Sequence, residues 1–380
     1  MKHISKLLFI IILPLSCYAQ QTINGSITHD GLQRDYILYI PASYTGSTEV
    51  PLVFNFHGYG SNATQQMWYG DFRSIADTAG FLIVHPEGTL FNGTSHWNVG
   101  GWTVGSTVDD VGFTAALMDS LAAEYSIDES RVFATGMSNG GFMSFLLACQ
   151  LSEKIAAISS VTGSMTPETY NNSNPQHPTP ILQMHGTSDG TVPYNGTAWT
   201  KSIDEVIQYW VGYNNCNTTP TVTALPDIDP NDGSTVEHFV YGDGENGVSV
   251  EHYKIIGGGH TWPGNAFGGA GTNNDIDASM EIWKFFSRYD INGFIGTTGI
   301  EQLMKGDLEL VIYPNPSTST ISIQGKLTYP VKYELISLTG KILMQGKINS
   351  KHQQINMSDL SPGIYYLKIE GKVYKVLRLK

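Results

Sequence analysis

The sequence predicts an α/β protein with a doubly wound, mostly parallel sheet, followed by a small all-β sandwich. Through residues 20–290, short aliphatic strands alternate with amphipathic helices, a pattern typical of a parallel sheet covered on both faces. After residue 308, period-two runs are separated by Gly, Pro, Asn and Ser. The net charge also changes sign, from −18 over residues 1–300 to +5 over residues 301–380. We therefore expect two folded domains.

The composition excludes two classes of protein. Of the 380 residues, 41% are hydrophobic and only 14% are charged, which excludes a disordered or low-complexity chain. The chain contains 34 acidic and 21 basic side chains, and the excess of acid lies in the larger part. Because such a surface repels phosphate backbones, nucleic acid is not expected as a partner.

Residues 1–19 have the pattern of a secretory signal peptide. Lys2 and Lys6 precede an apolar run, Leu7–Leu15, that is too short to span a bilayer. The residues 17–19 then place small side chains three and one positions before Gln20, as signal peptidase requires. A lipid anchor at Cys17 is the alternative, but Pro14 lies where an aliphatic residue is expected.

The elements expected in the first domain follow one another in a regular order. Strands are predicted at 22–28, 33–40, 51–56, 81–85, 131–135, 156–161, 180–185 and 248–256, and helices at 109–125, 138–150, 201–213 and 275–289. In the helix 109–125, Phe113, Leu117, Leu121 and Tyr125 recur every four residues, which gives an apolar stripe to pack on the sheet.

The second domain is expected to begin after a linker. Residues 291–307 contain Gly- and Thr-rich sequence without helical or strand patterning, and we interpret them as the linker. Residues 308–380 contain the alternating runs of the predicted sandwich. The predicted organisation is therefore a signal peptide at 1–19, an α/β domain at 20–290, a linker at 291–307 and a β-sandwich at 308–380.

The motif that points most directly to chemistry is Gly136-Met-Ser-Asn-Gly140. It follows a predicted strand and precedes a predicted helix, as a nucleophile elbow requires. The two glycines lie where Cβ atoms would collide with so tight a turn. A glycine-rich turn without chemistry is the structural alternative, yet the context favours Ser138 as a nucleophile.

A serine hydroxyl needs an imidazole to take its proton and a carboxylate to orient that imidazole. In folds with a nucleophile elbow, the carboxylate residue follows the serine in the sequence, and the histidine follows the carboxylate residue. Asp189 lies in a loop after the predicted strand 180–185, and His260 follows the strand 248–256 directly, after three glycines. Asp227 and Asp229 are weaker candidates for the acid, and His185 precedes Asp189 and is expected to be a packed residue.

The oxyanion of an ester transition state needs two backbone N–H donors. One comes from the residue after the nucleophile, here Asn139, and the other from the loop after an early strand. Strand 51–56 ends in His57-Gly-Tyr-Gly60, so we assign Tyr59, although which amide of residues 58–60 donates is open.

Five motifs in order resemble the secreted esterases grouped as polyhydroxybutyrate depolymerase, feruloyl esterase and acetylxylan esterase, related to carbohydrate esterase family one. The resemblance covers residues 25–290 and implies an α/β-hydrolase fold with Ser138, Asp189 and His260 as nucleophile, acid and base. Many relatives carry Cys and Gln where this chain has Tyr59 and Ser61. The motifs are 57–60, 108–113 (VDDVGF), 136–141, 185–194 and 257–264.

The carboxy-terminal part carries a second resemblance. The segments 313–316 (YPNP), 340–341 and 360–368 (LSPGIYYLK) resemble the sorting domain of type IX secretion. A carbohydrate-binding sandwich is the alternative interpretation. The resemblance implies that the type IX machinery is a partner and that the protein is secreted or lies at the cell surface.

Three further features of the sequence concern the cysteines, a candidate metal loop and the tryptophans. In an exported chain Cys149 and Cys216 form an even pair, so one disulfide is expected, with two buried thiols as the alternative. Residues 227–238 imitate a calcium loop but lack the Glu at its twelfth position, so no metal site is expected. Of Trp68, Trp97, Trp102 and Trp262, only Trp262 is expected at the site, because it lies two residues from His260.

These observations together predict a secreted serine esterase that needs no cofactor and inserts stably in no membrane. Ester-substituted plant polysaccharide, with feruloyl or acetyl groups on xylan, is the first substrate hypothesis. A polyhydroxybutyrate depolymerase or short-chain ester hydrolase is the alternative. An inactive binding protein on a hydrolase scaffold is the alternative outside the enzymes.

Overall fold

The computed structural model describes residues 20–265 and 268–296 continuously, and most of the β-strands beyond residue 310. The predicted signal peptide and the linker residues 297–307 lie outside the described residues. The chain divides into two compact units between residues 296 and 297. In the part that the structure describes, no helix combines the length and apolar character needed to cross a membrane. The described residues of the second unit are 311–313, 317, 319–324, 330–337, 341–350, 354–361, 363–369 and 372–378.

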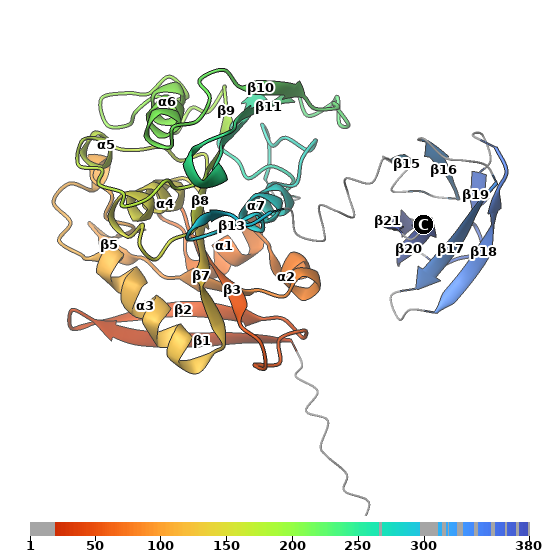
Figure 1. Ribbon diagram of the computed structural model, residues 1–380, viewed down its shortest axis with the longest axis horizontal. Helices are drawn as coiled ribbons and strands as arrows, with labels where there is room; N and C mark the ends of the chain where they lie inside the picture. The colour runs from red at the N-terminus through yellow and green to blue at the C-terminus, as the bar shows by residue number, and fades with distance from the viewer. Residues whose placement is uncertain are drawn as a thin grey trace, which may run out of the picture. The chain divides into compact units, whose positions relative to one another are not determined.

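A ten-stranded sheet forms the centre of the larger unit, in the order β1-β2-β4-β3-β7-β8-β9-β12-β11-β10 (Figure 1). The six central strands from β4 to β12 are parallel, and two antiparallel strands extend the sheet at each end. The strands are β1 Gln21–His29, β2 Leu32–Ile40, β3 Val50–Phe56, β4 Leu82–Pro86, β7 Ile127–Gly136, β8 Ala157–Val161, β9 Ile181–Gly186, β10 Thr221–Ala224, β11 Thr235–Tyr241 and β12 Val250–Ile256.

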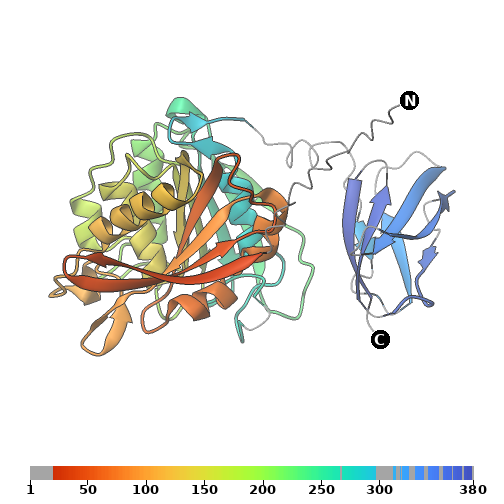
Figure 2. The same cartoon turned by 90° about the horizontal axis from the view of Figure 1, so that it is seen from below.

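Helices cover both faces of this sheet (Figure 2). Buried side chains of α3, α4 and α6 pack on one face, and those of α2 and α7 pack on the other. Alternation along β3 serves both layers, because Leu52, Phe54 and Phe56 face the first layer and Val53 faces the second. The helices are α1 Ala63–Tyr69, α2 Arg73–Ala79, α3 Asp110–Glu124, α4 Asn139–Gln150, α5 Pro167–Asn171, α6 Ile203–Tyr213 and α7 Ala278–Phe286.

Small elements complete this unit: the hairpin β5 Thr89–Phe91 and β6 Thr94–His96, the hairpin β13 Tyr289–Asp290 and β14 Gly293–Phe294, and the short 3₁₀ turns Gly101–Thr103 and Glu245–Gly247. The predicted fold class is confirmed. Sequence reasoning did not predict α1, α2, α5 or the edge strands β10 and β11. These elements are short or lie on the edge, so their hydrophobic periodicity spans too few residues to be recognised.

The second unit is all β. It contains a three-stranded sheet, β15-β16-β19, and a four-stranded sheet, β18-β17-β20-β21. Inward-facing residues of both sheets form one hydrophobic cluster that includes Ile321, Leu335 and Leu367. The strands are β15 Val311–Tyr313, β16 Thr320–Gln324, β17 Val331–Ser337, β18 Ile342–Ile348, β19 Gln354–Asn356, β20 Gly363–Ile369 and β21 Lys372–Arg378.

Candidate active site

The turn at Ser138 joins the end of β7 to the start of α4 and is strained. Ser138 has φ 54° and ψ −119°, a positive φ that L-residues rarely adopt. The turn presses against the end of β3, because a Cβ on Gly136 would lie 2.5 Å from the carbonyl oxygen of Phe56 and one on Gly140 would lie 2.1 Å from it. Glycine is therefore required on both sides of the serine. The half-buried Ser138 lies in the geometry of a nucleophile elbow.

Asp189 lies in the loop after β9, with its carboxylate fully buried. Its Oδ1 accepts hydrogen bonds from the backbone N–H groups of Thr191 and Val192, both at 2.8 Å. Its Oδ2 lies 2.7 Å from Nδ1 of His260. Burial alone would raise the pKa of Asp189, but the hydrogen bond and charge of His260 outweigh it and lower the pKa. The carboxylate is thus held ionised and aimed at one ring nitrogen.

The loops that carry these two residues are tied together. The N–H of Ser188 donates to the carbonyl of Gly258 at 2.9 Å, and the N–H of Thr187 donates to the carbonyl of Ile255 at 2.8 Å. A Cβ on Gly186 would lie 2.2 Å from the carbonyl oxygen of Gly258, so only glycine permits this approach. The parallel pairing of β9 with β12 brings both loops to one edge of the sheet. This packing fixes the contact between Asp189 and His260.

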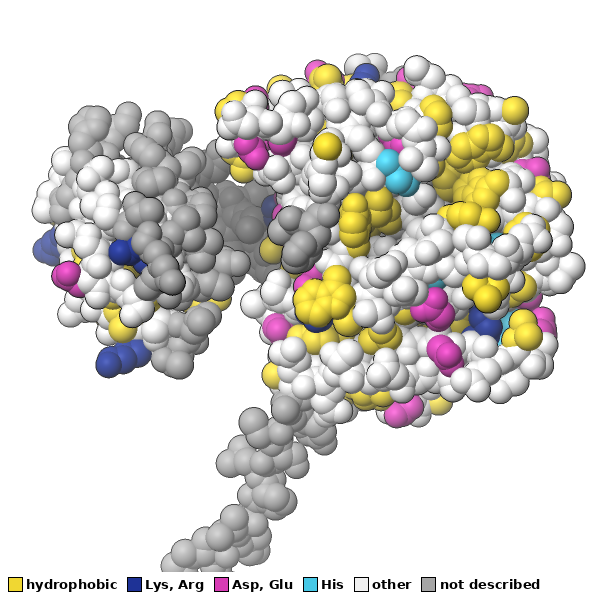
Figure 3. Space-filling view, turned by 180° about the vertical axis from the view of Figure 1, so that it is seen from behind, with side chains coloured by type: hydrophobic (Ala, Val, Ile, Leu, Met, Phe, Trp, Pro, Cys, Tyr) yellow, Lys and Arg dark blue, Asp and Glu magenta, His cyan; other side chains and the backbone are white. Residues whose placement is uncertain are grey.

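Ser138 and His260 border the same cavity, which has a volume of about 580 Å³. Figure 3 shows hydrophobic side chains gathered around a hollow on one face of the larger unit, with an exposed histidine beside them. Among the described residues no hydrogen bond joins Ser138 to His260. In active sites without substrate such contacts are often long and shorten when substrate binds. The lining residues are Gly58, Tyr59, Ser61, Thr64, Gln65, Gln66, Trp68, Tyr69, Met137, Ser138, His260 and Asn265.

The loop after β3 approaches the nucleophile closely. A Cβ on Gly58 would lie 3.4 Å from the Cβ of Ser138. The N–H of Gly60 donates to the carbonyl of Ser95 at 2.9 Å, so this amide is already used. Within the described ranges, the N–H groups of Tyr59 and Asn139 have no acceptor in the protein. Because the N–H of Gly60 already has an acceptor and that of Tyr59 has none, Tyr59 is favoured over Gly60 as the second candidate donor to an oxyanion.

The structure does not support the expected role of Trp262 in substrate binding. Its side chain is only 2% exposed and is not part of the cavity wall. The indole nitrogen donates to Oγ of Ser279 at 3.2 Å, and the ring packs edge-on against Phe72. Trp262 is therefore a core residue beneath the site. On α1, Trp68 is 54% exposed and lines the cavity, so part of the wall is built by a helix that the sequence pattern did not predict.

The expected disulfide between Cys149 and Cys216 is wrong, because both cysteines are free and buried. The Sγ of Cys149, near the end of α4, accepts a hydrogen bond from Oγ of Ser173 at 2.9 Å. The Sγ of Cys216 lies 3.9 Å from the carbonyl oxygen of Val248. Burial raises the pKa of Cys149 to about 12 and that of Cys216 to about 11. The alternative interpretation, two buried thiols, is the one observed.

Sequence reasoning assigned His185 to packing alone, and the structure adds a contact. His185 is fully buried, and its Nε2 lies 2.8 Å from the carbonyl oxygen of Val192 and 3.4 Å from Oδ2 of Asp189. Burial lowers the pKa of His185, although Asp189 acts in the opposite direction. The neutral ring therefore lies beside the same carboxylate oxygen that contacts His260. A spacing of four residues between His185 and Asp189 was the available signal.

Family comparisons agree with both resemblances. Residues 34–174 match the model described as "Esterase PHB depolymerase", and residues 111–239 match "Phospholipase/Carboxylesterase". Residues 311–378 match "Secretion system C-terminal sorting domain". The predicted resemblances to an esterase group and to a sorting domain are therefore confirmed.

Two curated relatives are esterases. A bifunctional acetylxylan esterase/xylanase of Neocallimastix patriciarum is 28% identical over 280 residues, covering 73% of this chain and 37% of the relative. Feruloyl esterase B of Piromyces equi is 28% identical over 243 residues, covering 60% of this chain and 42% of the relative. The chain thus spans about two fifths of the length of these relatives.

Among solved structures, an acetyl xylan esterase from Aspergillus awamori has a TM-score of 0.51 at 17% identity, covering 71% of this chain and 99% of that structure. At this identity the similarity concerns the fold. It agrees with the mostly parallel sheet and its helices on both faces.

Proposed function

We propose that the chain is an exported serine esterase in which Ser138, His260 and Asp189 hydrolyse a carboxylic ester through an acyl-enzyme. The observation that carries the proposal is the 2.7 Å contact between Nδ1 of His260 and Oδ2 of Asp189, on a cavity that Ser138 also lines. Because the Nδ1–H donates to the carboxylate, the other ring nitrogen, Nε2, is free to act as a base.

The reaction follows from these positions. Oγ of Ser138 attacks the ester carbonyl while Nε2 of His260 takes its proton, and the imidazolium that forms is stabilised by Asp189. The oxyanion accepts hydrogen bonds from the N–H groups of Asn139 and Tyr59. His260 then returns the proton to the leaving alcohol, which departs as the tetrahedral centre collapses. Water cleaves the acyl-enzyme by the same steps.

The aromatic side chains in the cavity wall support an ester with an aryl acyl group as substrate. Three aromatic residues, Tyr59, Trp68 and Tyr69, line it beside Ser138, and two of them are exposed. Such walls suit a flat ring, since aromatic pairs gain about 0.5–1.5 kcal/mol beyond burial of area. The aromatic wall and the feruloyl esterase relative favour feruloyl esters on xylan, and the acetylxylan esterase relative favours acetyl esters on xylan. Polyhydroxybutyrate or a short-chain ester is the second candidate, supported by the match of residues 34–174.

A substrate panel tests this assignment. Methyl ferulate, acetylated xylan and polyhydroxybutyrate film are offered to the native protein and to Ser138→Ala. We expect the native protein to turn over at least one ester and Ser138→Ala to turn over none. The highest kcat/KM is expected for methyl ferulate or acetylated xylan. No turnover of any ester by the native protein would contradict the enzyme assignment and leave an inactive binding protein on a hydrolase scaffold.

The aromatic wall has its own test. Trp68→Ala is expected to lower kcat/KM for methyl ferulate about tenfold while leaving p-nitrophenyl acetate within twofold. Leu32→Ala is the control, since Leu32 is similarly exposed at 44% but is not part of the cavity wall. Equal losses on both esters would show that Trp68 has no role in choosing the acyl group.

Export by the type IX machinery, to the medium or the cell surface, is the proposed role of the carboxy-terminal domain at 308–380. The match of residues 311–378 to a secretion sorting domain supports it. A chain truncated after residue 300 is expected to keep esterase activity and to lose export. Normal export with lost binding to polysaccharide would instead support the carbohydrate-binding alternative.

A further inference from the structure

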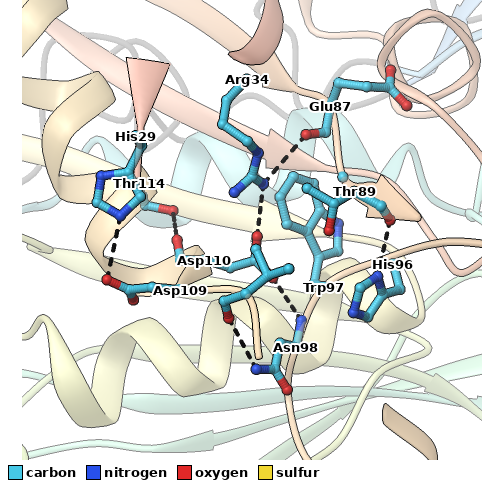
Figure 4. Close-up of polar contacts among 12 residues, drawn as sticks. His29, Arg34, Glu87, Thr89, His96, Trp97, Asn98, Asp109, Asp110 and Thr114 are labelled. Carbon is cyan, nitrogen blue, oxygen red and sulfur yellow. Dashed lines mark hydrogen bonds and ion pairs between the residues drawn. The ribbon is translucent and has the colours of Figure 1, made fainter. Parts of the chain in front are cut away.

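The motif at residues 108–113 has no place in the proposed reaction, yet its second carboxylate is the centre of a buried network (Figure 4). Asp110, at the first position of α3, is 2% exposed. Its Oδ1 accepts from Nη2 of Arg34 at 2.7 Å, and its Oδ2 accepts from the N–H of Asn98 at 2.7 Å. Arg34 is itself 1% exposed and stacks over the ring of Phe113, with Cζ 3.8 Å from its centroid. Such a buried charge pair is costly unless its geometry is good.

This network reaches Asn139 through a single peptide group. The N–H of Asn98 belongs to the same peptide as the carbonyl of Trp97, which accepts from Nδ2 of Asn139 at 3.1 Å. The N–H of Trp97 also donates to Oδ1 of Asn139 at 2.7 Å. The side chain of Asn139 is therefore held by both backbone groups of Trp97. Asp110, paired with Arg34, polarises the peptide that lies between them.

Trp97 also reaches the other candidate donor. Its indole Nε1 donates to the carbonyl of His57 at 2.9 Å. This carbonyl belongs to the peptide between His57 and Gly58, and the next peptide along the chain carries the N–H of Tyr59. Its ring packs edge-on against Phe56, with centroids 5.0 Å apart. A single fully buried residue thus binds both sides of the candidate oxyanion hole, although the two sides come from different strands.

We propose that Asp110 and Trp97 are positioning residues that set the spacing between the N–H groups of Asn139 and Tyr59. This inference rests on the proposed function. The two amides lie in separate loops, so their mutual distance depends on whatever joins those loops. The series of contacts from Arg34 through Asp110, Asn98 and Trp97 joins the two loops, and none of these residues lines the cavity. Catalysis by such donors depends on a geometry fixed before reaction.

Two variants break the network at different points. Trp97→Phe removes the indole donor to His57 and keeps an aromatic ring and the backbone contacts with Asn139. Asp110→Asn retains one side-chain oxygen, and the positive charge of Arg34 keeps that oxygen on its own side. The new NH₂ group then faces the N–H of Asn98, so the hydrogen bond from Asn98 is lost. Asp109→Asn is the matched control. Asp109 is half exposed, and it caps α3 through the N–H of Gly112.

The measurements are kcat and KM for p-nitrophenyl acetate, the inhibition constant of an aryl trifluoromethyl ketone, and the thermal unfolding temperature. The ketone forms a tetrahedral adduct whose oxyanion occupies the hole. Both variants are expected to lower kcat 10- to 100-fold with KM within threefold, and to weaken the ketone by the same factor. Asp109→Asn is expected to leave kcat and ketone binding within twofold, even if it unfolds at a lower temperature.

Several outcomes would overturn the inference. A folded Trp97→Phe and Asp110→Asn with kcat within twofold of native would do so, as would a fall in kcat without weaker ketone binding. If neither variant is recovered folded, the network is a folding element and the positioning role fails. Ser138→Ala, assayed in parallel, separates these results from failure of the proposed function, because loss of hydrolysis in that variant supports the enzyme whatever the network does.

Discussion

Replacement of Asp189 by Asn is expected to disable the imidazole without disturbing the loop. Oδ1 of Asp189 accepts from two backbone N–H groups, those of Thr191 and Val192, so the oxygen of the new amide must stay there. The NH₂ group then takes the place of Oδ2, 2.7 Å from Nδ1 of His260. A donor at that position forces the proton of the ring onto Nε2, where the base is needed.

The magnitude follows from this change of tautomer. The corresponding substitution in serine proteases lowers kcat by about 10⁴, which is about 5.5 kcal/mol of activation free energy. We expect a fall of 10³–10⁴ in kcat for p-nitrophenyl acetate at pH 8, with KM within threefold. Thermal unfolding and circular dichroism check that the variant is folded. A folded Asp189→Asn that retains more than a tenth of native kcat would refute the assigned role of the carboxylate.

Three other predictions concern the turn, the acid stability and the thiols. Gly140→Ala brings a Cβ within 2.1 Å of the Phe56 carbonyl oxygen, so the end of β3 must move by about 1 Å. We expect kcat to fall at least 100-fold or the protein not to fold, and near-native kcat would contradict the packing. Glu251 is buried, which would raise its pKa, but His238 and Arg288 lower the pKa from 4.5 to about 2. This carboxylate therefore contributes stability above pH 4.5, on the order of 3 kcal/mol, that is lost as the pH falls toward 2. Denaturant unfolding of Glu251→Gln should show lower stability at pH 7 and a weaker loss on acidification, and an unchanged pH profile would count against the linkage. Because Cys149 and Cys216 are buried with raised pKa values, Ellman's reagent should titrate two thiols only after denaturation in protein without residues 1–19, which carry Cys17. A titre of no thiols before or after denaturation would show that the two cysteines form a disulfide.

The parallel sheet was predictable because its strands are buried on both faces. Such strands read as short aliphatic runs, and the helices between them are amphipathic. Helix 109–125 of the sequence is α3, Asp110–Glu124, and the strand 51–56 is β3, Val50–Phe56. The candidate site was predictable for a related reason. Chemistry limits which side chains can activate a serine, and residues after parallel strands meet at one edge of the sheet.

The direction of individual side chains, and the contacts that depend on it, were not predictable. Trp262 lies two residues from His260 but turns into the core toward Ser279, and spacing in a loop does not report direction. The even number of cysteines indicated a pair, yet each thiol has a separate partner in the core. The link from Asp110 to Asn139 depends on the orientation of the peptide between Trp97 and Asn98, which no periodicity encodes.

The central claim is that Ser138 is made nucleophilic by His260 and Asp189. A fluorophosphonate probe, followed by intact mass and peptide mapping, tests it most directly in the full chain. We expect one adduct per chain, on Ser138, formed at least 10³ times more slowly in His260→Ala. No adduct on the folded native protein, or an adduct on another residue, would contradict the assignment.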